Sequence, residues 1–283
     1  MTRRELYRLK KRIKAHVKRA ALILAMLLAV VLMICGCLYI FEHLGSSNKK
    51  TNADQKIETD KGNEDSETKG EEPEVPQQPL TIEEQLLSTY NYQYNKPDAS
   101  GLHICLDAGH GGNDGGTQSG NVIEKDVNFA ITKKVEALLK EAGATVSLVR
   151  DTDEYVDLAD RTYIANQSGA SFLLSLHCNY FEGDTSINGL EIYYHRNSET
   201  SKQYAEEMTT LLRAANAMNV RDASKQNMQV LRNSSIPAIM IEMGFLSNPE
   251  ECANLNDPLY QEYLAHLLAE SLAAVLKPTA AGA

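Results

Sequence analysis

The sequence predicts an α/β fold, a single three-layer domain with a mostly parallel sheet of about six strands and helices on both faces. Two observations carry this prediction. Short apolar runs of the kind expected for buried strands recur along residues 101–278. Between most of them lie segments whose apolar residues repeat at helical spacing, which is typical of helices that bury one face. Strands that alternate with helices in this way indicate a parallel sheet.

The expected strands lie at 102–106, 145–149, 172–176, 189–194, 229–231 and 237–243. The run at 189–194 alternates apolar and polar side chains, which favours a place nearer the edge of the sheet. The expected helices lie at 127–142, 157–169, 198–215 and 260–275, and a further helix begins at Pro249. Asp157 is a typical N-cap, and Pro249 stands at a first helical position, where proline is favoured.

Two histidines stand out because each directly follows a buried apolar run. His110 follows the strand expected at 102–106, and His177 follows the strand expected at 172–176. Ligands of open parallel sheets bind at the carboxyl ends of the strands, so the two imidazoles are expected to meet there if the strands are neighbours. Zinc hydrolases use three His or carboxylate ligands. Either histidine alone would more often be an ordinary turn residue, whereas the pair indicates a metal site.

The segment 109–116 is rich in glycine, which allows tight turns and a close approach of the backbone to a ligand. A phosphate-binding loop is the obvious alternative, because the segment lies between a strand and a helix. The motif G-x-x-x-x-G-K-[ST] is absent from the sequence, and Asp114 breaks the pattern G-x-G-x-x-G. The segment therefore fits a metal site better than a phosphate site.

Two acids are further candidates for the site. Glu124 lies at the entrance of the helix expected at 127–142, where the helix dipole favours an acid whether or not it binds a metal. Glu242 lies inside the apolar run 237–243, where an unpaired charge is costly. Glu242 is therefore expected either in a buried ion pair or as a general base beside a metal.

Several motifs occur in a fixed order along the expected domain. They are Leu106–Gly112, Glu124-Lys125 with Asn128, Val149-Arg150 with Asp153, Leu158 with Arg161 and Ala165-Asn166, Ser175–Asn179, Ser201-Lys202, Val230–Arg232 and Pro237–Asn248. In these motifs and their order, residues 101–277 resemble the zinc-dependent N-acetylmuramoyl-L-alanine amidases of the family-3 type, which trim bacterial peptidoglycan.

The resemblance implies that His110, Glu124 and His177 bind one zinc ion and that Glu242 is the catalytic acid and base. It also implies the reaction, which is hydrolysis of the amide between the lactyl group of N-acetylmuramic acid and L-alanine. The substrate would be peptidoglycan. Two alternatives stay open: a catalytically inactive wall-binding or regulatory domain, and a zinc peptidase or amidohydrolase of other specificity.

Three further residues are expected to orient the ligands or the substrate: Asp107, Asn179 and Arg232. One departure from the family pattern is the stretch 221–225, where an Arg-Gly pair is expected and Arg-Asp is found. This departure bears on the lip of the substrate groove and leaves the metal ligands unaffected.

The N-terminal part of the chain has a different composition. We expect a basic cytoplasmic arm at 1–19, a transmembrane signal-anchor helix at 20–41, an acidic disordered linker at 42–88 and a connecting segment at 89–100, before a catalytic domain at 101–278. The stretch 20–41 has no charged residue in 22 positions and would span roughly 30 Å as a helix. A cleaved signal peptide and a lipoprotein signal at Ile34–Cys37 are the alternatives.

The charge distribution sharpens the expectations about location and partners. Residues 1–19 hold nine basic residues and one acid, while the whole chain has 28 basic and 38 acidic residues and a net charge of −10. The remainder is therefore strongly acidic, which argues against binding to nucleic acid. The basic flank predicts a single-pass protein of the cell membrane whose catalytic domain faces the cell wall. A regulatory or targeting protein is a further expected partner, because the chain carries no wall-binding repeat.

Overall fold

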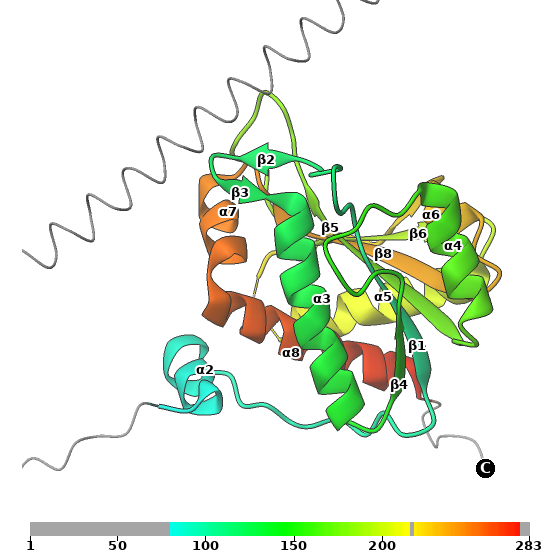
Figure 1. Cartoon of the computed structure of the whole chain (residues 1–283). Coiled ribbons are helices and arrows are strands. Elements are labelled where there is room, and N and C mark those ends of the chain that lie inside the picture. The colour runs from blue at the N-terminus through cyan, green and yellow to red at the C-terminus, as the bar shows by residue number, and fades with distance from the viewer. Residues whose placement is uncertain (1–79, 216–217, 278–283) are drawn as a thin grey trace, which may run out of the picture. The chain divides into compact units, whose positions relative to one another are not determined.

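The computed structural model describes residues 80–215 and 218–277, which hold seven helices and eight strands. Element labels follow Figure 1. Six strands form one sheet, in the spatial order β4 (Thr145–Leu148), β1 (His103–Ala108), β5 (Phe172–Asn179), β8 (Ala238–Phe245), β6 (Glu191–His195) and β7 (Ser224–Gln226). All neighbours are parallel except β8 and β6. The predicted fold class, a mostly parallel six-stranded α/β sheet, is confirmed.

Helices cover both faces of this sheet (Figure 1). They are α2 (Ile82–Tyr90), α3 (Glu124–Glu141), α4 (Leu158–Gln167), α5 (Glu199–Ala214), α6 (Gln229–Arg232), α7 (Pro249–Asn256) and α8 (Pro258–Leu276). Alternate residues of β1 show the two layers: Ile104 and Leu106 pack in the cluster under α3, α5 and α8, while Cys105 packs in the cluster under α4 and α6. Burial on both faces explains why the strands are continuously apolar in the sequence.

The predicted helix starts are confirmed by their caps. The Asp157 side chain accepts a hydrogen bond from the backbone N–H of Ala159 at the start of α4. Asn248 accepts from the backbone N–H groups of Glu250 and Glu251, and Pro249 takes the first position of α7. These caps satisfy N–H groups that a helix start leaves without intrahelical partners.

The strand expected at 229–231 is wrong, because these residues form the one-turn helix α6. Val230 and Leu231 are both buried in the cluster with α4, whereas adjacent residues of a strand point to opposite faces. The sixth strand is instead β7, which consists of Ser224, Lys225 and Gln226. Its polar composition gives no hydrophobic signal, so the sequence pattern did not reveal it. A second small sheet, β2 (Gln118–Ser119) with β3 (Val122–Ile123), was also not expected.

The segment before β1 packs against α8. The ring of Tyr90 stacks on that of Tyr263 with centroids 4.4 Å apart, and the Tyr92 hydroxyl donates a hydrogen bond of 2.6 Å to Glu270. The helix α2 overlaps the last residues of the linker expected at 42–88. The membrane-spanning helix expected at 20–41 lies outside the described residues. Within the part of the chain that the structure describes, no helix is long and apolar enough to cross a bilayer.

Candidate metal centre

His110 lies just beyond β1 with its backbone held in an unusual conformation. Its φ angle is +61°, in the left-handed region that side chains other than glycine rarely occupy. The Arg161 guanidinium donates a hydrogen bond of 2.7 Å to the His110 carbonyl, and Asp114 Oδ2 lies 2.9 Å from His110 Nδ1. With Nδ1 fixed by the carboxylate, Nε2 faces Glu124 Oε1 at 3.1 Å. A carboxylate on the far nitrogen is the usual support of a metal-binding histidine.

His177 approaches the same oxygen from β5, with Nδ1 3.0 Å from Glu124 Oε1. Its ring occupies space that only glycine leaves free, because a Cβ on Gly109 would lie 2.2 Å from His177 Cε1. Gly116 serves in the same way, since a Cβ there would lie 2.4 Å from Glu124 Oε2. Gly109 and Gly116, both in the glycine-rich segment 109–116, are therefore required because His110, Glu124 and His177 pack closely against them.

Glu124 is the first residue of α3 and is buried. The backbone N–H groups of Thr117 and Cys178 donate to its carboxylate at 2.8 and 3.2 Å. Burial acts to raise the pKa of Glu124, but the hydrogen bonds with His110 and His177 outweigh it and hold the pKa well below its usual range. Glu124 is therefore an anion at neutral pH, as a metal ligand must be.

The three side chains together fit a zinc ion. One ligand atom from each of His110, Glu124 and His177 lies within 4.8 Å of the others. Two imidazoles and one carboxylate are a ligand set of catalytic zinc sites, which leave a fourth position for water or substrate. Both imidazole nitrogens converge on one carboxylate oxygen, an arrangement that a shared cation would stabilise. The metal site expected from the strand ends is thus present as a cluster of donors.

Glu242 lies on β8 directly beside His177, its partner in the strand register. Its side chain is 8% exposed, and its Oε2 atom has no hydrogen-bond partner among residues 80–215 and 218–277. The pKa of Glu242 is raised to about 7, chiefly by burial and also by the nearby carboxylates of Glu124 and Glu191, against a lowering by His177 and His110. The described residues provide no cation that forms a salt bridge with Glu242, which removes support for the buried ion pair. A carboxyl that titrates near neutral pH is suited to proton transfer.

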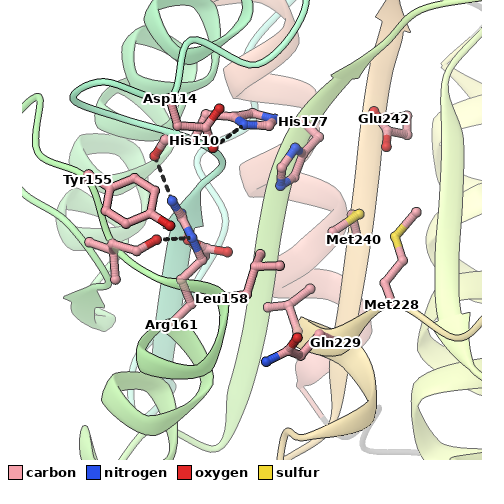
Figure 2. A pocket seen from close by; sticks show the side chains of 13 residues that line it. His110, Asp114, Tyr155, Leu158, Arg161, His177, Met228, Gln229, Met240 and Glu242 are labelled. Atoms are coloured by element: carbon pink, nitrogen blue, oxygen red, sulfur yellow. Dashed lines mark hydrogen bonds and ion pairs between the residues drawn. The ribbon is translucent and has the colours of Figure 1, made fainter. Parts of the chain in front are cut away.

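A pocket of about 430 Å³ opens beside the three candidate metal ligands. His110, His177 and Glu242 line it, as Figure 2 shows, and Asp107, Asp114, Arg161 and Gln229 add further polar groups. The rest of the lining is mostly apolar and includes Tyr155 and Met228. A cavity of this size with a few convergent polar groups has the form of a small-molecule site, here open enough to receive part of a larger substrate.

The three residues expected to orient ligands or substrate have different surroundings. Asp107 is fully buried, pairs with Arg161 at 2.7 Å and accepts a hydrogen bond from Ser175. Asn179 donates to Glu191 at 2.8 Å and does not contact the three donors in any described hydrogen bond. Arg232 is exposed, donates to the Asn227 carbonyl and is not part of the pocket lining. The structure therefore places Arg232 outside the site.

Three residues of the site were not identified from the sequence as contributors. Asp114 supports His110, and its position four residues after a histidine in a glycine-rich loop was the only available signal. Arg161 joins Asp107 to the His110 carbonyl. Glu191 pairs with Glu242 in the strand register and accepts hydrogen bonds from Asn179, Tyr193 and Arg221, which are contacts that no local pattern reveals.

An open α/β sheet with a His-Glu-His cluster at its carboxyl edge and a buried carboxyl group beside it is an arrangement typical of metal-dependent hydrolases. Comparison with known proteins identifies the family within that class. Residues 104–274 match the family described as N-acetylmuramoyl-L-alanine amidase, and this match covers more than half of the chain. The chain belongs to this family.

Similar proteins carry related names. A probable cell wall amidase, LytH, of Staphylococcus epidermidis is 31% identical over 175 residues, which are 61% of this chain and 57% of the relative. The LytH protein of Staphylococcus aureus is 29% identical over 180 residues, which are 62% of this chain and 59% of the relative. The match thus spans less than two thirds of these relatives.

Solved structures agree with the family assignment. The crystal structure of an N-acetylmuramoyl-L-alanine amidase from Clostridium difficile 630 is 35% identical, with a TM-score of 0.59, over 62% of this chain and 96% of that one. The CwlD amidase from Clostridioides difficile, solved in complex with the GerS lipoprotein, is 30% identical, with a TM-score of 0.57, over 62% of this chain and 98% of that one.

Proposed function

We propose that this chain hydrolyses the amide between the lactyl group of N-acetylmuramic acid and L-alanine in peptidoglycan. One observation carries the proposal beyond family membership. The three donors His110, Glu124 and His177 lie directly beside a buried carboxyl, Glu242, whose Oε2 has no partner among the described residues and which lines the pocket. An intact donor set next to an available proton acceptor is what amide hydrolysis requires.

A zinc ion held by His110, Glu124 and His177 would act as a Lewis acid, which would polarise the scissile carbonyl and make water more acidic. The residues of the chain do the rest. Glu242 accepts a proton from the attacking water and then donates it to the nitrogen of the leaving amine. One carboxyl group therefore carries out both proton transfers. Asp114 holds Nδ1 of His110 and leaves Nε2 to bind the metal. Glu124 stays anionic because its two histidine partners lower its pKa.

The test uses the purified full chain, loaded with zinc, on isolated peptidoglycan sacculi. We expect release of free stem peptides and of glycan chains whose muramic acid carries no peptide, both identified by mass spectrometry. The variant Glu242→Gln should release neither. If the zinc-loaded chain binds sacculi without releasing peptide, the inactive wall-binding alternative replaces the proposal. Cleavage inside the stem peptide would instead indicate a zinc peptidase.

We also propose that the stretch 20–41 anchors the protein in the cell membrane, with the N-terminus cytoplasmic and the catalytic domain facing the wall. The uncharged stretch, its basic flank and the extracytoplasmic location of peptidoglycan support this orientation. Protease added to intact protoplasts should remove the catalytic domain and spare residues 1–19. If the domain resists the protease until the cells are lysed, the orientation is wrong.

A regulatory or targeting protein is a further part of the proposal. The relative CwlD was solved in complex with a lipoprotein, GerS, which shows that an amidase of similar structure binds a protein partner. Cross-linking of the full chain in its native membrane, followed by mass spectrometry, would identify such a partner for this chain. Recovery of the uncross-linked chain alone would count against it.

A further inference from the structure

The order of the strands fixes how the polar groups of the site are arranged across the pocket. His110 follows β1, His177 lies on β5 and Glu242 lies on β8, and these three strands are consecutive neighbours in the sheet. Glu242 therefore flanks the metal ligands on the side of β6 and β7. The loop that follows β4 flanks them on the opposite side and contains Tyr155. Figure 2 shows this separation, with Tyr155 near His110 and Asp114, and with Glu242 beyond His177.

The position of Glu242 determines which half of the substrate lies on which side, provided that the proposed amidase function holds. Glu242 must come within hydrogen-bond reach of the leaving nitrogen to donate a proton to it. The amine half, which is the stem peptide, therefore extends toward β8 and β6, past Met228 and Met240. The acyl half extends the other way. In this substrate the acyl half is the lactyl group and the N-acetylmuramic acid ring to which it is attached.

The loop on the acyl side is fixed to the metal-binding loop. Asp153 accepts a hydrogen bond of 2.8 Å from the Gly112 backbone N–H and forms a salt bridge of 2.6 Å with Lys125. The two backbones are in such close contact that a Cβ on Gly112 would lie 2.6 Å from the backbone nitrogen of Tyr155. Tyr155 is thus held in place relative to His110, and little conformational entropy is lost when a ligand binds to it.

Tyr155 presents a large apolar surface from this fixed backbone. Tyr155 is 54% exposed although it lines the pocket, and Leu158, which also lines the pocket, is exposed to a similar extent. An aromatic ring with a polar hydroxyl suits a partly wet site. A pyranose ring has one face of C–H groups that packs against an aromatic ring, while its hydroxyl groups stay in water. The chemistry on this side of the pocket therefore matches a sugar.

We propose that Tyr155 is the platform that binds the N-acetylmuramic acid ring of the substrate, and that the stem peptide binds on the Met228 side. Tyr163 provides a comparison, because it is 65% exposed on the same helix as Leu158 but does not line the pocket. If Tyr155 were only an exposed surface residue, its replacement by alanine should affect ligand binding as little as the replacement of Tyr163.

The experiment measures the two halves of the substrate separately. The full chain without zinc is titrated by NMR with the peptide-free disaccharide of N-acetylglucosamine and N-acetylmuramic acid, and in a second series with the free stem peptide. Relative to the wild type, Tyr155→Ala should weaken binding of the disaccharide by about tenfold and binding of the peptide by less than about twofold. Tyr155→Phe should bind the disaccharide about as tightly as the wild type does. Met228→Ala should show the reverse preference, and Tyr163→Ala should bind both ligands as the wild type does.

Kinetics complete the test. With a soluble muropeptide as substrate, Tyr155→Ala should raise KM by about tenfold and change kcat by less than about threefold, because the ring contact is made before and during the reaction. If Tyr155→Ala weakens the peptide and spares the disaccharide, the orientation is reversed. If Tyr155→Ala binds both ligands as tightly as the wild type does, Tyr155 is not the platform. The same conclusion follows if the wild type does not bind the disaccharide at about 10 mM, a concentration at which even a weak site would be occupied. A wild type that cleaves no muropeptide contradicts the proposed function itself, which is a separate outcome.

Discussion

Replacing Arg161 with methionine should both destabilise the domain and weaken metal binding. Arg161 is 3% exposed and pairs with Asp107, which is 0% exposed. The same guanidinium donates to the carbonyls of Ala108 at 2.9 Å and His110 at 2.7 Å. Without it, Asp107 keeps only the hydroxyl of Ser175 as a hydrogen-bond partner among the described residues.

The expected loss follows from these contacts. Removing one partner of a buried ion pair typically destabilises by about 3–5 kcal/mol, because the other charge is left buried and unpaired. If the carboxylate is neutralised at the same time, in Asp107→Asn with Arg161→Met, part of that loss should be recovered. The double variant should therefore be more stable than the sum of the two single losses predicts, by about 1–3 kcal/mol.

Unfolding in urea can be followed by tyrosine fluorescence, because the full chain has 13 tyrosines and no tryptophan. Zinc affinity, measured by competition with a chelator, should fall by about 10- to 100-fold in Arg161→Met, since the strained backbone of His110 loses a support. Gln203→Met, an exposed site on α5, is the control and should change neither quantity. A loss of less than about 1 kcal/mol with unchanged zinc affinity would refute the reasoning.

Three other predictions concern separate parts of the domain. Glu242→Gln should lower kcat by at least about 100-fold while the zinc content stays the same, as metal analysis would show. Gly109→Ala should lower zinc affinity because its Cβ would lie 2.2 Å from the ring of His177. His266 is buried and its pKa is lowered from 6.5, mainly by burial, so its contribution to stability should be complete above about pH 6.5 and be lost as the pH falls below it. His266→Gln should reduce this loss in urea unfolding between about pH 7 and pH 5.

Each of these predictions has a control or a contrary result. Loss of zinc from Glu242→Gln would mean that the residue supports the metal and is not restricted to proton transfer. Gly115→Ala is the matched control for Gly109→Ala, because its Cβ would meet only Ile123 at 3.4 Å, and equal losses in both variants would contradict the steric argument. If the free energy of unfolding falls with pH equally in the wild type and in His266→Gln between pH 7 and 5, a group other than His266 titrates. If His266 is responsible, the two slopes should differ by up to about one proton.

The sequence was sufficient where one physical rule applies to a pattern that can be read from neighbouring residues. His110 and His177 were expected to meet because parallel strands end at one edge, and the register of β1 against β5 brings their rings to a centroid distance of 5.0 Å. Glu242 was notable because a charge inside an apolar strand needs a reason. The caps of α4 and α7 depend only on neighbouring residues, so they too were predictable.

Other features depend on contacts between residues distant in the sequence. Glu124 is at a helix start, where acids are common, and only its hydrogen bonds to two distant histidines distinguish it. The misplaced strand at 229–231 has a short apolar pattern that a one-turn helix satisfies equally well. The edge strand β7 is polar, so it is recognisable only from its pairing with β6.

The contacts before β1 have a mechanical consequence. Ala99 donates a backbone hydrogen bond to Ala142, at the carboxyl end of α3, whereas Glu124 occupies the opposite end of that helix. A helix of 18 residues is about 27 Å long, so the chain enters the domain far from the metal centre. A force that pulls on the chain before residue 80 would first load the contacts of α2 and Tyr92 with α8. The candidate metal ligands would remain undisturbed, as the proposed membrane anchor and wall-facing catalytic domain would require.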